Sequence, residues 1–313
     1  MDKIWDLIIV GAGPAGLSAA LYAARDEHEV LILERGVVGG NVAATEKLDN
    51  YPGFPDGVTG LELGERMKKQ AQKYGAKLAM AQVEKLKLDS DIKEITVDGG
   101  DKLRAKTILL ATGTTYRKLG VTGEAEMLGR GVHFCATCDA AFYKDKKVVV
   151  IGGGNSAVEE SGYIAKYAKE IDLIARGELT ATKTVIKEMQ PLVESGKITV
   201  HTFEDTTEIM SKDGVVTGVK TVNLKSKKET EWPADGVFVF IGQIPNTDFL
   251  KDSGVKLCEM GYVLTEDNKT NLSGVFAAGD VCAWATQQAV VAAGDGVKAA
   301  LAINQYLQYN NNK

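Results

Sequence analysis

The chain has 313 residues, 44% hydrophobic and 25% charged, which is typical of a globular protein of about two domains. Its net charge of −5 argues against a nucleic-acid or anionic-membrane partner, and no apolar run is long enough for a membrane span. The amino-terminal residues lack a signal-peptide layout, and four cysteines are too few for a disulfide scaffold. We therefore expect a cytoplasmic protein in a reducing compartment.

The first elements predict a dinucleotide-binding unit. An apolar strand over residues 7–10 leads directly into Gly11-Ala12-Gly13-Pro14-Ala15-Gly16, followed by an Ala-rich helix over 17–25. A second apolar strand over 30–33 ends at Glu34. In this pattern the first glycine permits a tight turn, the second lets a pyrophosphate approach the backbone, and the third lets helix and strand pack closely. The acid at the end of the second strand can accept hydrogen bonds from ribose hydroxyls.

The next stretch predicts an amphipathic helix, two half-exposed strands and a buried strand, over 61–74, 79–88, 92–97 and 107–111. Gly39-Gly40-Asn41 permits close approach of a ligand to the backbone, although ordinary turn chemistry explains it equally well. Thr112-Gly113-Thr114 at the end of the buried strand permits the same approach.

Cys135-Ala136-Thr137-Cys138-Asp139 has the pattern of a redox-active pair of thiols with a neighbouring proton donor. A Cys-x-x-Cys pair can also be half of a zinc site, but zinc normally takes four ligands, and the other cysteines and the histidines are scattered. An inert buried pair is a further alternative. We expect His133 to have a packing or turn role, because Asp139 already supplies the acid.

The nucleotide-binding pattern then repeats at an offset of 141 residues. A strand over 148–151, the loop Gly152-Gly153-Gly154-Asn155-Ser156-Ala157, a helix over 158–169 and a strand over 171–174 match the first unit. The chain therefore carries two dinucleotide-binding units, the second inserted in the middle. Two nucleotides and a dithiol imply an electron relay.

The two units differ where the second strand ends. Ala175 replaces the acid, and Arg176 follows it. An arginine here suits the additional phosphate of NADP, whereas an acid suits NAD. The alternative is an ordinary solvated charge at a strand end.

The remaining residues predict a helix, six strands and a long final helix. Their expected ranges are 182–195, 198–202, 206–210, 215–224, 229–232, 236–241, 274–278 and 287–307. Pro245 stiffens the exit from the inserted unit. Gly279-Asp280 ends the last strand, where the aspartate could bind a polyol chain.

These motifs resemble the low-molecular-weight thioredoxin reductases from end to end. The resemblance also includes Asn50-Tyr51-Pro52-Gly53, Gly242 with Pro245-Asn246-Thr247, and Gly279-Asp280-Val281. It implies an α/β protein with two Rossmann-like, three-layer ββα domains, the second inserted into the first. The implied boundaries are 1–116 plus 244–313 for the FAD domain and 117–243 for the pyridine-nucleotide and dithiol domain.

The family further implies a homodimer in which domain rotation presents the dithiol alternately to flavin and to thioredoxin. Electrons would pass from NADPH through FAD to Cys135–Cys138 and then to thioredoxin, with Asp139 as acid and base. The implied flavin-binding residues are Gly11, Gly13, Pro14, Ala15, Gly16, Glu34, Arg35, Gly40, Asn41, Asn50, Val83, Thr112, Gly113, Gly279, Asp280, Gln288 and Ala289. The implied pyridine-nucleotide residues are Gly152, Gly154, Asn155, Ser156, Ala157 and Arg176.

The sequence departs from the family at the donor site. NADPH-using members have His-Arg-Arg and a further arginine after the second strand, and here only Arg176 matches, with Glu178 close by. Gln287 stands where the family usually has arginine. The retained loop favours NADPH, but ferredoxin or a deazaflavin stays open as the donor. A flavin-dependent oxidase of small dithiols and a non-enzymatic redox sensor are the remaining alternatives.

Overall fold

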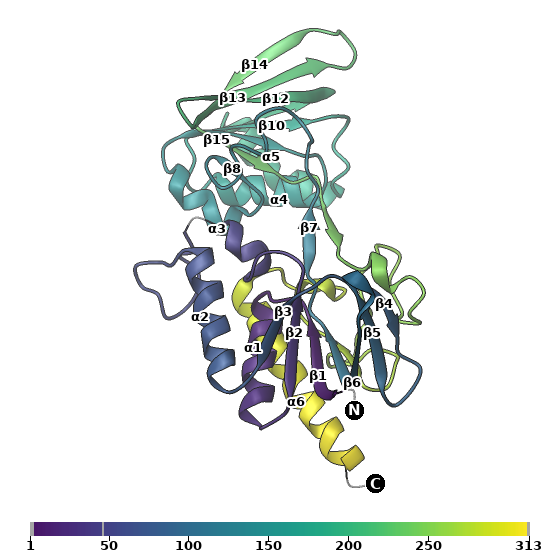
Figure 1. Ribbon diagram of the computed structural model, residues 1–313. Helices are drawn as coiled ribbons and strands as arrows, with labels where there is room; N and C mark the ends of the chain where they lie inside the picture. Colours follow the sequence, from purple (N-terminus) through teal and green to yellow (C-terminus); the bar gives the residue numbers. More distant parts are fainter. Residues whose placement is uncertain (1–2, 46, 312–313) are drawn as a thin grey trace. The chain divides into compact units, whose positions relative to one another are not determined.

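The structure, a computed structural model, describes residues 3–45 and 47–311 and divides the chain into two compact units (Figure 1). Unit 1 combines Met1–Thr115 with Ile244–Lys313, and unit 2 is Tyr116–Gln243. The chain passes between the units through β7 (Thr114–Tyr116) and β16 (Gln243–Pro245), which pair as a two-stranded sheet. The predicted α/β fold with one unit inserted into another is confirmed.

Besides those linking strands, unit 1 contains β1 (Ile4–Val10), α1 (Pro14–Arg25), β2 (Val30–Glu34), η1 (Gly40–Ala44), α2 (Gly60–Lys73), β3 (Lys77–Met80), β4 (Val83–Lys87), β5 (Lys93–Val97), η2 (Asp98–Gly100), β6 (Lys102–Leu110), η4 (Asp248–Leu250), β17 (Val275–Ala277), η5 (Gly279–Val281) and α6 (Ala289–Asn311).

The unit 1 sheet has the order β3-β2-β1-β6-β5-β4, with β17 also paired to β6. Strands β3, β2, β1, β6 and β17 are parallel, whereas β4 and β5 are antiparallel. β5 pairs with residues 102–105 of β6, and β17 pairs with residues 108–110. The loops after β1, β2, β6 and β17 therefore leave the sheet at the same edge, where ligands of open α/β sheets bind.

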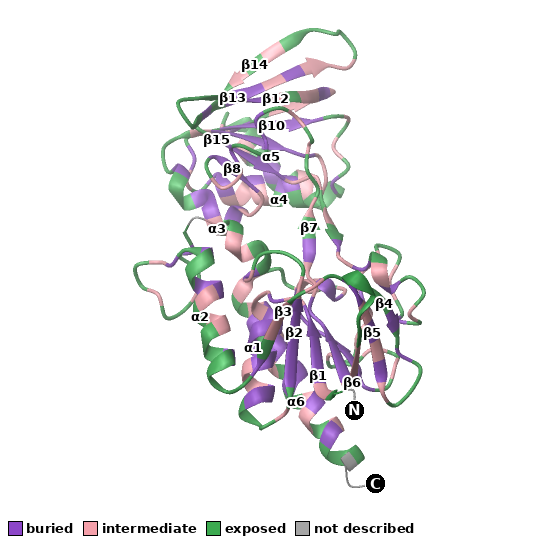
Figure 2. Cartoon of the chain, viewed as in Figure 1, coloured by how far each residue is buried: buried purple, intermediate pink, exposed green. Residues whose placement is uncertain are grey.

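Helix α1 packs against both α2 and α6 beside this sheet, and the central strands are buried (Figure 2). Alternate residues of β1 serve opposite faces, as strand geometry requires. Leu7 and Ile9 join the cluster that includes α1 and α6, whereas Ile8 and Val10 join a second cluster with β4, β5 and Leu250. The small alanines of α1 allow the helix to lie close to both neighbours.

The prediction of a single strand over 79–88 is wrong, because the strand is interrupted between β3 and β4. β3 pairs with β2, whereas β4 pairs with β5. At the break the amide of Ala81 donates to the Glu34 carbonyl, and the amide of Gln82 donates to the Asp98 carboxylate at 2.8 Å. The alternating sequence pattern continues through the break and conceals it.

Unit 2 contains β8 (Val132–His133), α3 (Ala136–Asp139), η3 (Ala140–Tyr143), β9 (Lys147–Ile151), α4 (Asn155–Ile164), β10 (Glu170–Ala175), α5 (Lys183–Glu194), β11 (Ile198–Thr202), β12 (Glu204–Lys212), β13 (Val215–Asn223), β14 (Glu229–Pro233) and β15 (Gly236–Val239).

A five-stranded parallel sheet, β11-β10-β9-β15-β8, forms the centre of unit 2. Val148 and Val150 of β9 pack with α4 and α5, whereas Val149 and Ile151 pack with the antiparallel sheet β12-β13-β14. Unit 2 therefore has three layers, because successive residues of β9 face opposite sides of the sheet and Val148–Ile151 are all apolar, so both faces need a covering layer. Helix α4 ends at Ile164, earlier than predicted, where tighter turns replace its regular hydrogen bonds.

Candidate active site

The first glycine loop of unit 1 is shaped to receive an anion. α1 begins at Pro14 directly after Gly13, and no side chain caps its amino end. A Cβ atom built on Gly13 meets no atom within 4 Å, so this face of the backbone is open. An uncapped helix amino terminus presents amide hydrogens and a positive dipole end to negative groups.

Two other glycines of the loop are required by close packing. Gly11 has a φ of 109°, and a Cβ there would lie 2.4 Å from the carbonyl oxygen of Ala111. A Cβ on Gly16 would lie 2.0 Å from the carbonyl oxygen of Gly11. The loop can therefore sit between β1, β6 and α1 only without side chains at these positions.

Glu34 fixes the loop from the end of β2. Its Oε2 accepts from the Ala12 amide, and its Oε1 accepts from the Gly36 amide, both at 2.7 Å. Each carboxylate oxygen has a further lone pair, so these bonds leave acceptor capacity for ribose hydroxyls. The predicted ribose contact stays a prediction.

Asp280 has a buried acceptor oxygen that a hydroxyl group could satisfy. It lies in η5 after β17, next to Gly279, where a Cβ would stand 2.9 Å from that of Ala15. Its Oδ1 is buried without a hydrogen-bond partner in the described part of the chain. Burial, with a smaller contribution from the charge of Asp295, raises the pKa of Asp280 to about 6. A buried acceptor in this condition suits a hydroxyl donor from a polyol.

The other predicted flavin-binding residues also lie in unit 1. A Cβ on Gly40 would lie 3.4 Å from the Cα of Gly13, so the two loops are adjacent. The contacts of the remaining polar members are Asn50 Nδ2 to Gln288 Oε1 at 3.3 Å, Asn41 Nδ2 to the Thr114 carbonyl at 2.9 Å, Arg35 to Asn246 Oδ1 at 3.2 Å and Thr112 Oγ1 to the Asn246 carbonyl at 2.9 Å. Gly113 has a φ of 62°, Val83 is buried at the start of β4, and Ala289 begins α6.

The second glycine loop, in unit 2, repeats the first. A Cβ on Gly152 would lie 2.3 Å from the Phe240 carbonyl oxygen and 2.9 Å from the Cβ of Ala157. Helix α4 begins at Asn155 after Gly154, again without a side-chain cap. Asn155 Oδ1 accepts from the Thr182 amide at 2.8 Å, and Ser156 is exposed beside it. This loop provides a second helix amino terminus for an anion.

Arg176, the arginine predicted to bind a phosphate, is held by an acid. Its Nε lies 3.2 Å from Asp205 Oδ1, and its side chain is 78% exposed. The segment that follows folds back onto the glycine loop, where the amides of Thr180 and Ala181 both donate to the Gly153 carbonyl. A phosphate would have to compete with Asp205 for Arg176.

The two thiols of the Cys-x-x-Cys motif form a disulfide, with their Cα atoms 5.3 Å apart. Cys135 precedes α3, and its Sγ accepts from the Cys138 amide at 3.2 Å. Burial raises the pKa of the Cys282 thiol to about 12, which makes it a poor nucleophile, and Cys258 is half-buried. Within the described residues, no group of three or more His, Cys, Asp or Glu side chains could hold a metal ion.

Asp139 directly follows Cys138 in the chain, is buried, and lies close to His133. His133 Nδ1 lies 3.2 Å from Asp139 Oδ2, and His133 Nε2 lies 2.7 Å from the Tyr143 hydroxyl. The sequence interpretation of His133 as a packing residue is therefore incomplete, because the imidazole packs and also contacts the predicted acid. A histidine six residues before an aspartate was the only available signal, and it did not reveal that β8 and α3 bring them together.

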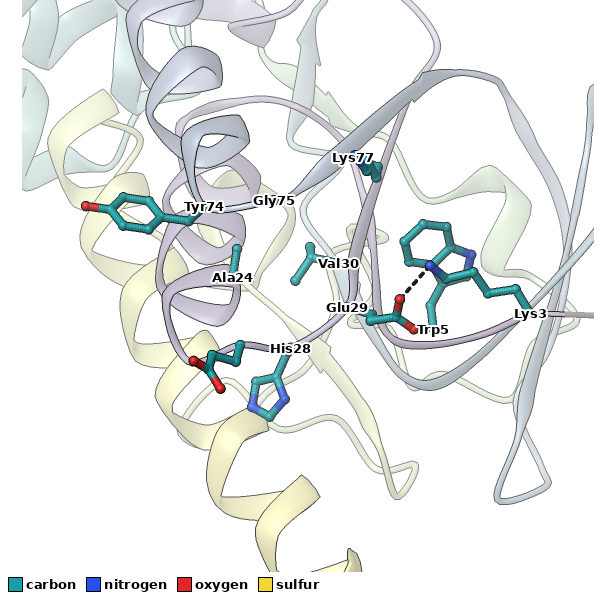
Figure 3. Close-up of a pocket in the computed structure, with 10 residues that line it drawn as sticks. Lys3, Trp5, Ala24, His28, Glu29, Val30, Tyr74, Gly75 and Lys77 are labelled. Atoms are coloured by element: carbon teal, nitrogen blue, oxygen red, sulfur yellow. Dashed lines mark hydrogen bonds and ion pairs between the residues drawn. The ribbon is translucent and has the colours of Figure 1, made fainter.

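A separate hollow of about 300 Å³ lies at the amino ends of β1 and β2, the opposite ends from the glycine loop (Figure 3). Lys3 and Glu29 form an ion pair across it at 2.7 Å, and Lys3 Nζ also lies 3.8 Å from the Trp5 ring centroid. None of the predicted site residues lines this hollow.

In the described part of the chain, no helix combines the length and the apolar character that crossing a bilayer requires.

Comparisons with known proteins agree with this geometry. The model of the family described as pyridine nucleotide-disulphide oxidoreductase matches residues 5–296. Thioredoxin reductases of Listeria monocytogenes and Peptoclostridium acidaminophilum are 38% and 40% identical, over 98% and 99% of this chain and 95% and 99% of their own lengths. The crystal structure of thioredoxin reductase from Streptococcus pyogenes superposes with a TM-score of 0.92 at 35% identity, covering 99% of this chain and 100% of that one. The chain is thus an oxidoreductase of the pyridine nucleotide-disulphide oxidoreductase family, related over its full length to the low-molecular-weight thioredoxin reductases.

Proposed function

We propose that this protein is a thioredoxin-disulfide reductase that uses NADPH as donor. In the overall reaction NADPH, one proton and the disulfide of thioredoxin give NADP⁺ and the thioredoxin dithiol. The observation that carries the proposal is the Cys135–Cys138 disulfide beside the buried Asp139. The full-length similarity to proteins named thioredoxin reductase supports thioredoxin as the substrate.

The residues of unit 1 fit FAD as the resident cofactor. The open backbone at Gly13 and the uncapped start of α1 suit its pyrophosphate, Glu34 suits a ribose, and the orphaned Asp280 oxygen suits its polyol chain. When bound, FAD supplies a two-electron carrier between a pyridine nucleotide and a disulfide. Burial makes ionised Asp280 costly, so a hydroxyl donor from FAD would stabilise the bound form.

The dithiol performs the exchange with thioredoxin. Once Cys135 and Cys138 are reduced, one thiolate attacks the thioredoxin disulfide, forming a mixed disulfide and expelling a thioredoxin thiolate. The second cysteine then attacks the mixed disulfide, which restores the Cys135–Cys138 bond and expels the second thioredoxin thiolate. Each expelled thiolate requires a proton, and we assign the supply of one to Asp139.

The ion pair at Arg176 favours a second candidate for the donor. Arg176 would have to leave Asp205 to bind the phosphate of NADPH, and Glu178 adds negative charge nearby in the sequence. Reduced ferredoxin or a deazaflavin would then deliver electrons to the same flavin and dithiol. NADPH is our first proposal because the loop around Gly152 and the helix start at Asn155 retain the form that nucleotides require.

The function is tested by assaying thioredoxin reduction with NADPH in Cys135→Ser and Cys138→Ser, using Cys258→Ser as the matched control. We expect both active-site variants to lose turnover and to retain the yellow flavin, whereas Cys258→Ser retains both. Turnover in either active-site variant would refute the assignment of the dithiol. Oxygen consumption with small dithiols, without thioredoxin reduction, would instead identify an oxidase. Sedimentation of the holoenzyme tests the homodimer that the family resemblance implies.

A further inference from the structure

His133 joins two side chains that the sequence does not connect. Its Nδ1 lies 3.2 Å from Asp139 Oδ2, and its Nε2 lies 2.7 Å from the Tyr143 hydroxyl. All three residues are buried. We propose that His133 is a positioning residue that, supported by Tyr143, holds the Asp139 carboxylate for proton transfer at the disulfide. The inference rests on the proposed function, because it assigns Asp139 a proton-transfer role.

The imidazole is held in place by its strand and by two aromatic rings. His133 ends β8 and lies in register with Phe238 of β15 in the parallel sheet. Its ring centroid is 5.3 Å from those of Phe238 and Tyr143, and the Tyr143 ring meets it edge-on. A ring enclosed in this way cannot turn away from Asp139 without disturbing the sheet core.

The hydrogen-bond roles follow from the chemistry of the partners. An ionised carboxylate only accepts, so His133 Nδ1 must carry a hydrogen when Asp139 is charged. In a neutral imidazole Nε2 is then an acceptor, and the Tyr143 hydroxyl donates to it. Tyr143 thus selects the tautomer that donates to Asp139, as second partners of histidines commonly do.

Gly236 leaves space for the ring of Tyr143. A Cβ on Gly236 would lie 2.1 Å from Tyr143 Cε1, so any side chain there would displace the tyrosine ring. Gly236 begins β15, the same strand that fixes His133. The geometry thus links one glycine, one tyrosine and one histidine to the position of a single carboxylate.

The proposed chemical consequence concerns the opening of the disulfide. An incoming thiolate forms a bond to one sulfur, the Cys135–Cys138 bond breaks, and the expelled sulfur leaves with the electron pair. That thiolate takes a proton from the Asp139 carboxyl, which becomes a carboxylate. Because His133 Nδ1 faces Oδ2, the proton is exchanged at the other oxygen, and the imidazole N–H stabilises the carboxylate product.

Other ionisable groups surround the arrangement. Besides the two thiols, Lys146 Nζ lies 5.4 Å from the Tyr143 ring centroid. The adjoining helix α4 carries Glu160, whose pKa is raised by its burial and then by the charge of Glu159. A variant at Asp139 is therefore needed to identify which group produces a pH effect.

The test measures the rate at which dithiothreitol opens the disulfide in the oxidised holoenzyme, across a pH series. Rates are corrected for the thiolate fraction of dithiothreitol, and products are trapped by alkylation and mass spectrometry. This assay needs neither NADPH nor thioredoxin. We expect the corrected rate to fall as pH rises, and we expect Asp139→Asn to abolish that pH dependence.

In His133→Leu the midpoint of the fall in rate with pH should move to higher pH by about one to two pH units, because a buried carboxylate loses a charge-assisted donor. His133→Asn retains an amide hydrogen near the Nδ1 position and should keep the midpoint within about half a unit. Tyr143→Phe should shift it upward by a smaller amount and provides the test if the leucine variant does not fold. Unchanged midpoints in Tyr143→Phe and in a folded His133→Leu, with rates lowered equally at every pH, would overturn the proposal. If the fall in rate with pH persisted in Asp139→Asn, the acid role of Asp139, on which the proposal rests, would be refuted.

Discussion

Gly16 lies against the backbone of Gly11 so closely that a Cβ atom on Gly16 would stand 2.0 Å from the Gly11 carbonyl oxygen. This contact sets the separation between α1 and the loop that leaves β1. The amide groups at the start of α1 keep their direction only while this contact is preserved. The anion site therefore depends on the absence of a side chain at Gly16.

Gly16→Ala should destabilise unit 1 by about 1–3 kcal/mol through overpacking, and the purified protein should lose most of its flavin. The matched control is Gly294→Ala, since Gly294 is in α6 and a Cβ there meets no atom within 4 Å. Flavin absorbance per mole of protein and thermal unfolding check both variants. Equal flavin content in the two variants would contradict the proposed nucleotide role of the first loop.

Asp280→Asn should change the pH dependence of stability in the flavin-free protein. The pKa of Asp280 is raised to about 6 from an ordinary 3.8, so the folded state holds its proton more tightly than the unfolded state. The free energy of unfolding of the wild type should therefore fall by about 3 kcal/mol as pH rises from 4 to 6, and then level off. The asparagine variant should lack this decrease while binding flavin more weakly. Denaturant unfolding at several pH values measures it, and equal slopes in the two proteins would refute the assignment.

Arg176→Gln tests the donor site. If Arg176 binds the additional phosphate of NADPH, its loss should raise KM for NADPH by about 10- to 150-fold, the worth of one charge-assisted hydrogen bond. KM for NADH, which lacks that phosphate, should stay unchanged and serves as the internal control. Steady-state kinetics with both nucleotides provides the measurement. An equal effect on both nucleotides would mean that the Asp205 ion pair has only a structural role.

The sequence repeat predicted the two nucleotide-binding units because its residues act locally. Strand, glycine loop and helix are consecutive in each unit, so the glycine spacing can be recognised within one short segment. The steric need for Gly16 also arises within its own loop, whereas Gly11 and Gly152 are required by the distant carbonyls of Ala111 and Phe240. The Cys135–Cys138 pair was equally predictable, since the two cysteines are only three positions apart.

The features that sequence could not predict depend on distant pairings. β8 has only two residues and exists because β15, about a hundred residues later, pairs with it. That pairing positions His133 at Asp139, and a two-residue strand has too little pattern to be seen. The Arg176–Asp205 ion pair likewise joins β10's exit to β12, so the competition for the phosphate-binding arginine appears only in the structure.

The most direct measurement is an anaerobic titration of the purified holoenzyme with NADPH, followed by addition of thioredoxin in its disulfide form. We expect stoichiometric bleaching of the flavin by NADPH and recovery of its colour when thioredoxin is reduced. Bleaching by dithionite but not by NADPH would contradict the donor and direct the search to reduced ferredoxin or a deazaflavin. Bleaching by NADPH without recovery by thioredoxin would contradict the central claim that this protein reduces thioredoxin.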